Sequence, residues 1–269
     1  MTGACPACGE SRHALSLRLP ASHVERCRRC GLGRTVPLPA EADGRECFAE
    51  NAAYFEDAVV APKDRWWHRF NAAPLEFLIT AGAPAGAHLL DVGCNVGYLV
   101  AAATERGFRA RGFDGSPAAV AVGRARFGVD VRCARLAPDA AEPVSEDVVV
   151  FNHVLEHLPD PGTALRAAAD WLRPRGWLVI GVPNFASPLA RVAGARWPGL
   201  VPEQHVWHFT PTALARLVRA AGFTAVRWRT CMLPYAPASL PDWSKWLVRR
   251  ALEPLRLADN LIVIARRAA

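Results

Sequence analysis

Three side chains that could transfer a proton or bind a metal lie close together in the segment HVLEHLPDP: His153, Glu156 and His157. If this segment begins a helix, their spacing places all three on one face. A histidine titrates near neutral pH and could take a proton from a hydroxyl or an activated carbon. Two histidines and a glutamate could instead hold a divalent metal. Alternatively, Glu156 and His157 only brace the local chain.

A second pair of histidines, His205 and His208, stands beside aromatic residues in the segment EQHVWHFTPTAL. This segment ends a long irregular stretch, and such loops often carry binding residues. We expect it to roof the site as an aromatic-walled pocket lined by Trp197, Trp207 and Phe209. In that arrangement His205 is the favoured general base and His208 orients the loop, although either could be an ordinary surface histidine.

Four of the eight cysteines have the spacing of metal ligands: Cys5, Cys8, Cys27 and Cys30. They form two CxxC pairs with 18 residues between the pairs. Four thiolates on two tight turns suit a tetrahedral zinc ion with no open coordination position. We therefore predict a structural zinc site, which would stabilise a segment too small to have a core of its own.

The remainder of the chain supplies a scaffold for these groups. From His88 onward, short apolar runs alternate with alanine-rich helical patterns. This order predicts a doubly wound α/β fold with a mostly parallel sheet of seven strands. The strands are expected near residues 88–93, 108–114, 129–133, 147–152, 177–183, 223–230 and 260–267. A further helix is expected from Thr210, which can cap it with Pro211 in the first turn.

The division of the chain follows its proline and glycine breaks. Residues 1–38 form the predicted zinc ribbon, residues 39–84 a helical cap or linker, and residues 85–269 the main domain. In the cap we expect two helical stretches, interrupted by Pro62 and Pro74. An amphipathic stretch within residues 231–258 is expected to form a lid, a dimer contact or a surface helix.

A glycine turn joins the first predicted strand of the main domain to the following helix. Gly93 and Gly97 lie in DVGCNVGYL, and Asp114 ends the next strand 21 residues beyond Gly93. The missing side chains allow a ligand to approach the backbone, and the carboxylate can accept hydrogen bonds from two ribose hydroxyls. The spacing G-x-x-x-G differs from the G-x-G-x-x-G of dinucleotide-binding enzymes, which disfavours a nicotinamide cofactor.

The segments DVGCNVGYL, GFDGS, DVVVFNHVLEHLPDP and GWLVIGVPN resemble the successive strand-end motifs of class I S-adenosylmethionine (SAM) dependent methyltransferases, whose fold is Rossmann-like. The resemblance covers roughly residues 85–269. It implies a SAM site in which Asp91 orients the amino group and Asp114 holds the ribose. The full set of implied cofactor contacts is Asp91, Gly93, Cys94, Asn95, Gly97, Asp114, Gly115, Ser116, Asn152 and His153.

The resemblance is incomplete at the adenine site. Many members place an acid after the third strand, whereas this chain has CARLAPDAAEPVS, with Asp139 as the nearest acid. The adenine contact therefore falls to Cys133, Ala134 and Arg135.

The segment around Glu156 is similar to that of ubiquinone O-methyltransferases, where such a cluster is associated with a metal. His153 stands where those enzymes have an acid, so a second divalent metal at His153, Glu156 and His157 is a further hypothesis. The segment EQHVWHF resembles a substrate-side loop of methyltransferases of glycan and natural-product pathways.

These observations predict a methyltransferase that acts on oxygen or carbon of a small-molecule acceptor, such as a sugar or a natural-product intermediate. One alternative is an RNA methyltransferase that grips nucleic acid through the arginines around the second cysteine pair; the other is a non-catalytic binding protein. The net charge of +7 is spread along the chain and favours neither an RNA nor another anionic partner. No membrane-spanning or secretory segment is evident, so a cytoplasmic location is expected.

Overall fold

The computed structural model describes residues 3–39, 63–232 and 251–269. Its strands are β1 (His13–Arg18), β2 (His23–Cys27), β3 (Gly33–Val36), β4 (His88–Val92), β5 (Arg109–Asp114), β6 (Val131–Cys133), β7 (Glu146–Asn152), β8 (Leu172–Pro183), β9 (Trp207–His208), β10 (Phe223–Cys231) and β11 (Asn260–Arg267). Its helices are α2 (Lys63–Thr80), α3 (Tyr98–Glu105), α4 (Pro117–Phe127), α5 (Pro161–Trp171), α6 (Pro188–Ala193) and α7 (Pro211–Ala220), with short 3-10 helices at Pro138–Ala140 and Gly194–Arg196.

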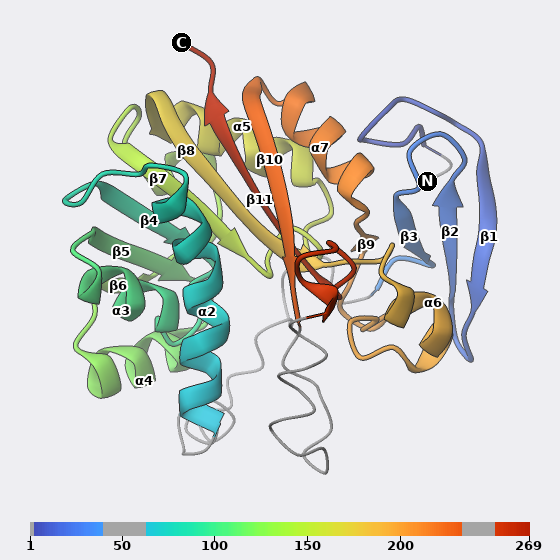
Figure 1. Cartoon of the computed structure of the whole chain (residues 1–269), viewed down its shortest axis with the longest axis horizontal. Coiled ribbons are helices and arrows are strands. Elements are labelled where there is room, and N and C mark those ends of the chain that lie inside the picture. The colour runs from blue at the N-terminus through green and yellow to red at the C-terminus, as the bar shows by residue number, and fades with distance from the viewer. Residues whose placement is uncertain (1–2, 40–62, 233–250) are drawn as a thin grey trace.

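The larger sheet has seven strands in the order β10-β11-β8-β7-β4-β5-β6 (Figure 1). β4 to β8 pair in parallel, whereas β11 is antiparallel to both β8 and β10. The chain builds outward from β4 to β6 and then returns to the other side of β4 as β7. The strand order therefore reverses between β4 and β7, and the crevice at their carboxyl ends is where ligands bind in such sheets. The predicted doubly wound, mostly parallel fold is confirmed.

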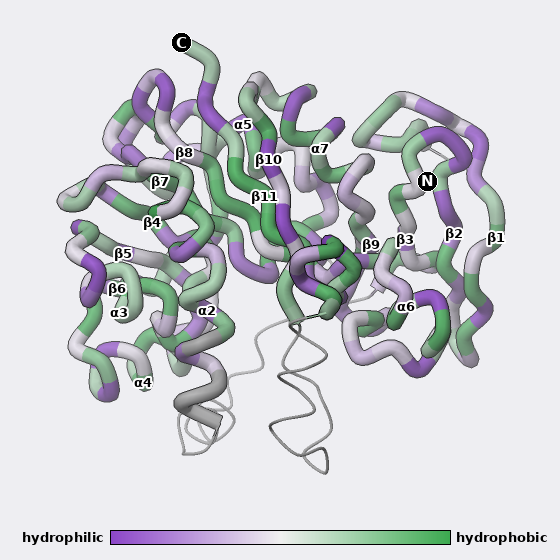
Figure 2. Tube along the Cα trace, in the orientation of Figure 1, coloured by the Kyte–Doolittle hydropathy of each residue, from purple (hydrophilic) through white to green (hydrophobic). Residues whose placement is uncertain are grey.

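The two faces of the sheet pack into separate cores. On β7, Val148 and Val150 pack with α2 and α3, whereas Val149 and Phe151 pack with α5 and α7. All four side chains are fully buried. A strand covered on both faces needs a continuous apolar run rather than an alternating pattern, which explains the sequence DVVVFN. Figure 2 shows the same hydrophobic character along β8 and β11.

The long helix α2 continues through Pro74, where the sequence predicted an interruption. A proline inside a helix costs about 3 kcal/mol, because it removes a backbone hydrogen bond and crowds the preceding turn. Leu75 and Leu78 are fully buried against the sheet. Burial of each leucine contributes roughly 1.5–3 kcal/mol, which offsets the cost of the proline. The helical stretch predicted before Pro62, and most of the amphipathic segment predicted within residues 231–258, lie outside the described residues.

Four helices begin with the same pair of signals, a side-chain cap followed by a proline. The caps are Ser116, Asp160, Ser187 and Thr210, each accepting a hydrogen bond from the backbone N–H three residues later. The proline fits the first helical position, where no N–H donor is required. The cap predicted at Thr210 is thus confirmed.

The second sheet contains four antiparallel strands in the order β1-β2-β3-β9. Its first three strands come from the cysteine-containing segment, whereas β9 comes from the segment before α7 (Figure 1). Gly33 of β3 pairs with His208, and Arg34 pairs with Trp207. The N-terminal ribbon is therefore joined to the main domain through a shared sheet, which the sequence did not predict.

Within the described ranges, no helix combines the length and apolar character that crossing a bilayer requires.

Candidate functional site

The turn after β4 has a backbone that requires glycine at two positions. Gly93 and Gly97 have φ values of 69° and 81°. A Cβ on Gly93 would lie 2.7 Å from Val154 Cγ2, and one on Gly97 would lie 2.9 Å from Val129 Cγ2. Both the left-handed backbone and the close packing therefore exclude larger residues. The turn is held tightly at the carboxyl end of β4, where the Gly93 and Cys94 N–H groups donate to the Phe113 carbonyl.

Asp114 ends β5 beside this turn and connects two neighbouring segments. Its Oδ2 accepts a hydrogen bond of 2.9 Å from the Asn95 N–H, and its Oδ1 accepts one of 2.8 Å from the Ser116 N–H. Burial raises the pKa of Asp114, although these two backbone donors act in the opposite direction. Gly115 follows directly, so the predicted acid, the glycine turn and the start of α4 meet at one edge.

Asp91 lies inside β4, 2% exposed, and its Oδ1 has no hydrogen-bond partner. Burial, followed by the charge of Asp114, raises the pKa of Asp91 well above its ordinary value. A buried carboxyl oxygen without a partner is costly unless a ligand completes its hydrogen bonds. A cationic amino group at the crevice would supply that partner.

The other residues predicted to contact the cofactor differ in how deeply they are buried. The Cys94 side chain packs among Val100, Val120 and Val131, so only its backbone can face a ligand. Cys133 is exposed, and Ala134 donates its N–H to the Asp114 carbonyl at 2.9 Å. Arg135 and Asp139 are also exposed, beyond the end of β6.

At the end of β7, Asn152 and His153 reach the same edge of the sheet. Asn152 Nδ2 donates to Asn71 Oδ1 on α2 at 2.9 Å, while Asn152 Oδ1 has no partner. His153 has a left-handed backbone with a φ of 58°, and its ring centroid lies 5.0 Å from that of Phe70. Sequence reasoning did not identify Asn71, because no motif connects α2 to this edge.

The spacing of His153, Glu156 and His157 would place them on one face if the segment began a helix. Residues 153–157 instead form a turn. The His157 N–H donates to the Val154 carbonyl at 3.0 Å. The helix begins later, after Asp160, because Asp160 and Pro161 supply the cap and the first-turn proline. The turn still brings His153 and Glu156 together.

His153 Nδ1 lies 3.0 Å from Glu156 Oε1, and the side chain of His153 is 22% exposed. When Nδ1 carries the proton shared with the carboxylate, Nε2 retains a free lone pair. Nε2 has no partner of its own. An imidazole that faces a carboxylate on one side and has a buried, unpartnered nitrogen on the other is the arrangement of a general base.

Glu156 is fully buried, and its Oε2 and the Nδ1 of His157 have no hydrogen-bond partners. Burial would raise the pKa of Glu156, but the His153 hydrogen bond and the charges of His153, His157 and His205 outweigh it and lower the pKa to about 2. The rings of His157 and His205 lie 4.7 Å apart. One ligand atom from each of Glu156, His157 and His205 lies within 4.8 Å of the others, so these three could hold a metal.

His205 and His208 are both buried, which disfavours their charged forms. Burial, with a smaller effect from His157 and His153, lowers the pKa of His205 to about 4. Burial and His205 lower the pKa of His208 to about 3. His205 Nδ1 lies 3.2 Å from the Gly199 carbonyl, which can only accept, so Nδ1 carries the proton and Nε2 is free.

His208 predicts an acid-sensitive contribution to stability. Its pKa of about 3 in the folded chain lies below the ordinary 6.5, so below about pH 6.5 only the unfolded chain takes up this proton. The contribution is complete above pH 6.5 and is lost as the pH falls toward 3, by about 1.4 kcal/mol per pH unit. In urea unfolding at pH 6.5, 5.5 and 4.5, His208→Gln should show a shallower loss of unfolding free energy than the wild type. His88→Gln is the control, and equal slopes for wild type and His208→Gln would contradict this assignment.

The four predicted zinc ligands converge at the base of the ribbon. Cys5 Sγ lies 3.5 Å from Cys30 Sγ, and Cys8 Sγ lies 3.6 Å from Cys27 Sγ. All four sulfurs lie within 4.8 Å of one another. A tetrahedron with zinc–sulfur bonds of 2.3 Å has edges of about 3.8 Å. The donor set and its spacing are therefore compatible with a zinc ribbon.

The aromatic residues expected to line a pocket are mostly buried in the protein core. Trp197 and Phe209 are 2% and 1% exposed and belong to packed cores rather than to a pocket wall. Trp207 is only partly buried, and its Nε1 donates to the Leu158 carbonyl at 3.0 Å. The three rings brace the loop that carries His205.

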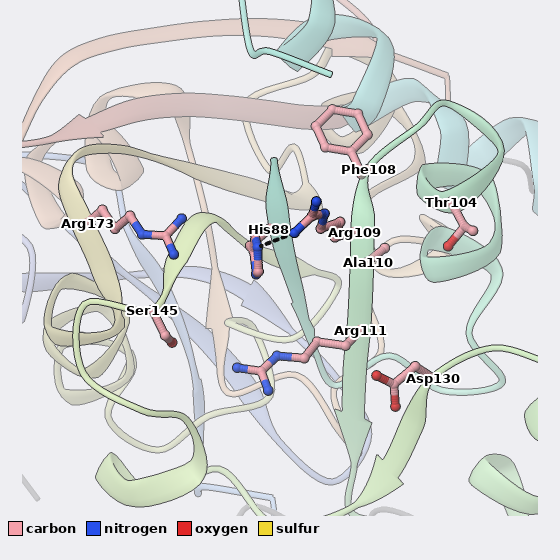
Figure 3. Close-up of a pocket in the computed structure, with 9 residues that line it drawn as sticks. All are labelled: His88, Thr104, Phe108, Arg109, Ala110, Arg111, Asp130, Ser145 and Arg173. Carbon is pink, nitrogen blue, oxygen red and sulfur yellow. Dashed lines mark hydrogen bonds between the residues drawn. The ribbon is translucent and has the colours of Figure 1, made fainter. Parts of the chain in front are cut away.

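A cavity of about 500 Å³ lies at the opposite edge of the sheet, where the strands begin (Figure 3). His88 contacts Arg109 there at 3.5 Å, while Arg111 pairs with Glu146 and Arg173 with Asp147. Arg111 and Arg173 are thus paired with carboxylates, and the cavity lies at the end of the sheet opposite the glycine turn. The chemistry predicted from the sequence gathers instead at the carboxyl edge.

A family model described as a methyltransferase domain matches residues 64–227. The chain belongs to this family. A ubiquinone biosynthesis O-methyltransferase from Xanthomonas euvesicatoria is 33% identical over 188 residues, which cover 62% of this chain and 78% of that protein. A protein of the same name from Chromobacterium violaceum is 29% identical over 179 residues, covering 59% of this chain and 77% of that protein.

Solved methyltransferases share the fold. A SAM-dependent methyltransferase from Thermotoga maritima covers 80% of this chain and 99% of its own, with a TM-score of 0.57 and 18% identity. A Burkholderia thailandensis 1,6-didemethyltoxoflavin-N1-methyltransferase, solved with that acceptor and S-adenosylhomocysteine, covers 95% of this chain and 99% of its own, with a TM-score of 0.56 and 20% identity. The chain is thus a SAM-dependent methyltransferase of class I, as the sequence predicted.

Proposed function

We propose that this methyltransferase transfers a methyl group to a small molecule, at a hydroxyl oxygen in preference to carbon, with a sugar or natural-product intermediate as the acceptor. The observation that supports this most directly is the free Nε2 of His153, backed by Glu156 at 3.0 Å. A hydroxyl has to lose its proton as it becomes a nucleophile, and this pair can accept one. Similarity to proteins named as O-methyltransferases supports oxygen.

In this proposal the SAM site spans the carboxyl ends of β4, β5 and β7. The orphaned oxygen of Asp91 binds the amino group, and Asp114 accepts hydrogen bonds from the ribose hydroxyls. The backbone of the glycine turn approaches the methionine part. The remaining cofactor contacts are assigned to Cys94, Asn95, Gly115, Ser116, Asn152 and His153.

The proposed reaction is an in-line displacement at the methyl carbon. The acceptor oxygen forms the new O–C bond as the C–S bond breaks, and the electron pair of that bond remains on sulfur in neutral S-adenosylhomocysteine. His153 Nε2 takes the hydroxyl proton, while Glu156 holds the ring in position. The protein therefore contributes alignment and proton removal, since the sulfonium supplies the leaving group. The sequence favoured His205 as the general base, but its side chain is buried too deeply for this role. His205 is assigned instead to the buried cluster that it forms with Glu156 and His157.

A divalent metal is proposed as a further cofactor. Glu156, His157 and His205 fit one, because they present unpartnered ligand atoms in a buried cluster and His205 is neutral. Two imidazoles and a carboxylate suit a cation such as Mn²⁺ or Zn²⁺. When bound, such an ion would neutralise the buried Glu156 carboxylate and fix the cluster that lies beneath His153.

The contacts of the arginines on the ribbon favour a small acceptor over RNA. The Arg26 Nε donates to the Gly31 carbonyl at 3.1 Å, and its guanidinium lies over the Phe185 ring. Arg34 pairs with Glu25 at 2.6 Å. Two of the four arginines that could grip phosphates are therefore engaged within the protein, while Arg28 and Arg29 are exposed.

The experiment is an S-adenosylhomocysteine release assay with three acceptor classes: phenolic or catecholic compounds, nucleotide-linked sugars, and structured RNA. We expect turnover with a small hydroxyl compound, reduced after mild chelation and restored by Mn²⁺ or Zn²⁺.

Metal analysis should count two ions per wild-type chain and one in His157→Ala, which retains the four cysteines. Turnover confined to RNA would overturn the acceptor proposal, and equal metal content in both proteins would overturn the second metal.

A further inference from the structure

The segment from His205 to His208 lies between the N-terminal ribbon and the turn that carries Glu156. On one side, the Val206 and Trp207 N–H groups donate to the Glu156 carbonyl at 2.8 and 3.1 Å. On the other side, β9 pairs with β3 of the ribbon. The position of His205 is therefore fixed from two directions.

Thr35 of the ribbon makes three contacts with this segment. Its N–H donates to the Val206 carbonyl at 3.0 Å, and its Oγ1 donates to the His205 carbonyl at 2.7 Å. Oγ1 also lies 2.9 Å from His208 Nε2. A hydroxyl has a single hydrogen, so once it donates to the carbonyl it must accept from the His208 N–H. Thr35 is 1% exposed, and water cannot replace these hydrogen bonds.

The same contact region extends to the thiol cluster. Thr210, which caps α7, donates its hydroxyl to the Cys30 carbonyl at 3.1 Å. A Cβ on Gly33 would lie 2.9 Å from His208 Cβ, so the two backbones meet without an intervening side chain. The four thiols share a continuous core with residues of α5 and α7. The ribbon and the catalytic domain are therefore packed as one body at this place.

We propose that the zinc ribbon forms a wall of the catalytic site, with Thr35 as the positioning residue that holds the His205–His208 segment against Glu156. Zinc bound by the four cysteines fixes the turns from which β3 begins, and β3 fixes the histidine segment. The catalytic meaning of this arrangement rests on the proposed roles of Glu156, His157 and His205. The mechanical coupling itself does not depend on them.

The coupling is tested by hydrogen exchange on the full-length protein, loaded with zinc and after zinc removal by a chelator. We expect exchange to rise at least tenfold in residues 33–36 and also in residues 205–210. Strands β4 and β5 serve as the internal reference and should keep their protection. If the ribbon amides exchange freely while residues 205–210 stay protected, the ribbon is an independent appendage and the proposal fails.

A second test leaves zinc in place, so it holds even if zinc removal unfolds the whole chain. Thr35→Val keeps the shape of the side chain and removes the hydroxyl, whereas Thr35→Ser restores the hydroxyl. Thr230→Val is the matched control, since Thr230 is also buried and its hydroxyl accepts a hydrogen bond from the Ala258 N–H. With zinc content unchanged, Thr35→Val should raise exchange in residues 205–208 and lower turnover on the order of tenfold.

In the same variant the affinity for S-adenosylhomocysteine should remain within twofold of wild type, and Thr35→Ser should recover most of the turnover. Exchange and turnover equal to those of wild type would overturn the role of Thr35. If exchange changes as expected but no acceptor gives turnover in any variant, the coupling stands and the proposed function fails.

Discussion

Asp114→Asn is expected to weaken binding of S-adenosylhomocysteine by about 100-fold. A carboxylate can accept hydrogen bonds from both ribose hydroxyls, and its charge strengthens each of them; the amide retains one acceptor and no charge. Hydrogen bonds to a charged group contribute about 1.5–3 kcal/mol, and 2.7 kcal/mol corresponds to about 100-fold in affinity. Calorimetric titration of the zinc-loaded protein measures this directly.

The control for Asp114 is Asp130→Asn, which makes the same chemical change in an exposed acid at the opposite edge of the sheet. Its affinity should equal that of wild type. Because Asp114 also accepts hydrogen bonds from the Asn95 and Ser116 N–H groups, thermal unfolding without ligand is needed as well. Wild-type affinity in a stably folded Asp114→Asn would remove this residue from the cofactor site.

His153→Gly is expected to lower turnover by 10²- to 10⁴-fold, the usual contribution of a general base. Glycine suits this position, because the φ of 58° is one that glycine adopts without strain. The variant also leaves space next to Glu156. Added imidazole should therefore restore part of the turnover, measured as S-adenosylhomocysteine release at saturating SAM.

Two observations separate a role in proton transfer from a role in binding. The His153→Gly protein should bind S-adenosylhomocysteine within a few-fold of wild type, and His88→Gln, at the far edge of the sheet, should retain full turnover. A parallel loss of cofactor affinity and turnover, with no response to imidazole, would assign His153 to cofactor binding alone.

Local sequence was sufficient to predict which residues meet at the carboxyl edge of the sheet. Gly93 and Gly97 follow β4 and Asp114 ends β5, and parallel strands bring their carboxyl ends together. The helix caps are equally local, since a capping side chain acts only three residues away. The predicted doubly wound, mostly parallel sheet was confirmed, as was the helix start at Thr210.

The errors arose where distant contacts override local signals. Pro74 stays inside α2 because buried leucines on that helix offset its cost, which cannot be judged before the core is known. Trp197 and Phe209 were expected in a pocket, but their rings pack into cores. The His153–His157 segment had a helical spacing, yet the Asp160–Pro161 signal for a later helix start was already present in the sequence.

Thr35 and β9 were beyond sequence reasoning. The hydrogen bond from Thr35 to the His205 carbonyl joins residues 170 positions apart, and a two-residue strand leaves no periodic pattern. The metal-ligand spacing of the cysteines indicated a ribbon but contained no information on its docking surface. Only the assembled sheet shows that surface.

The pairing of β3 with β9 also sets an order of events during synthesis. The four cysteines lie within residues 5–30, so the turns can take up zinc once β3 has left the ribosome. The edge of β3 then stays without its partner until residue 208 has been made, which at 5–20 residues per second takes roughly 10–35 s. During that interval an unpaired strand edge is open to other chains. We therefore expect this protein to aggregate most readily as an incomplete chain that ends before β9.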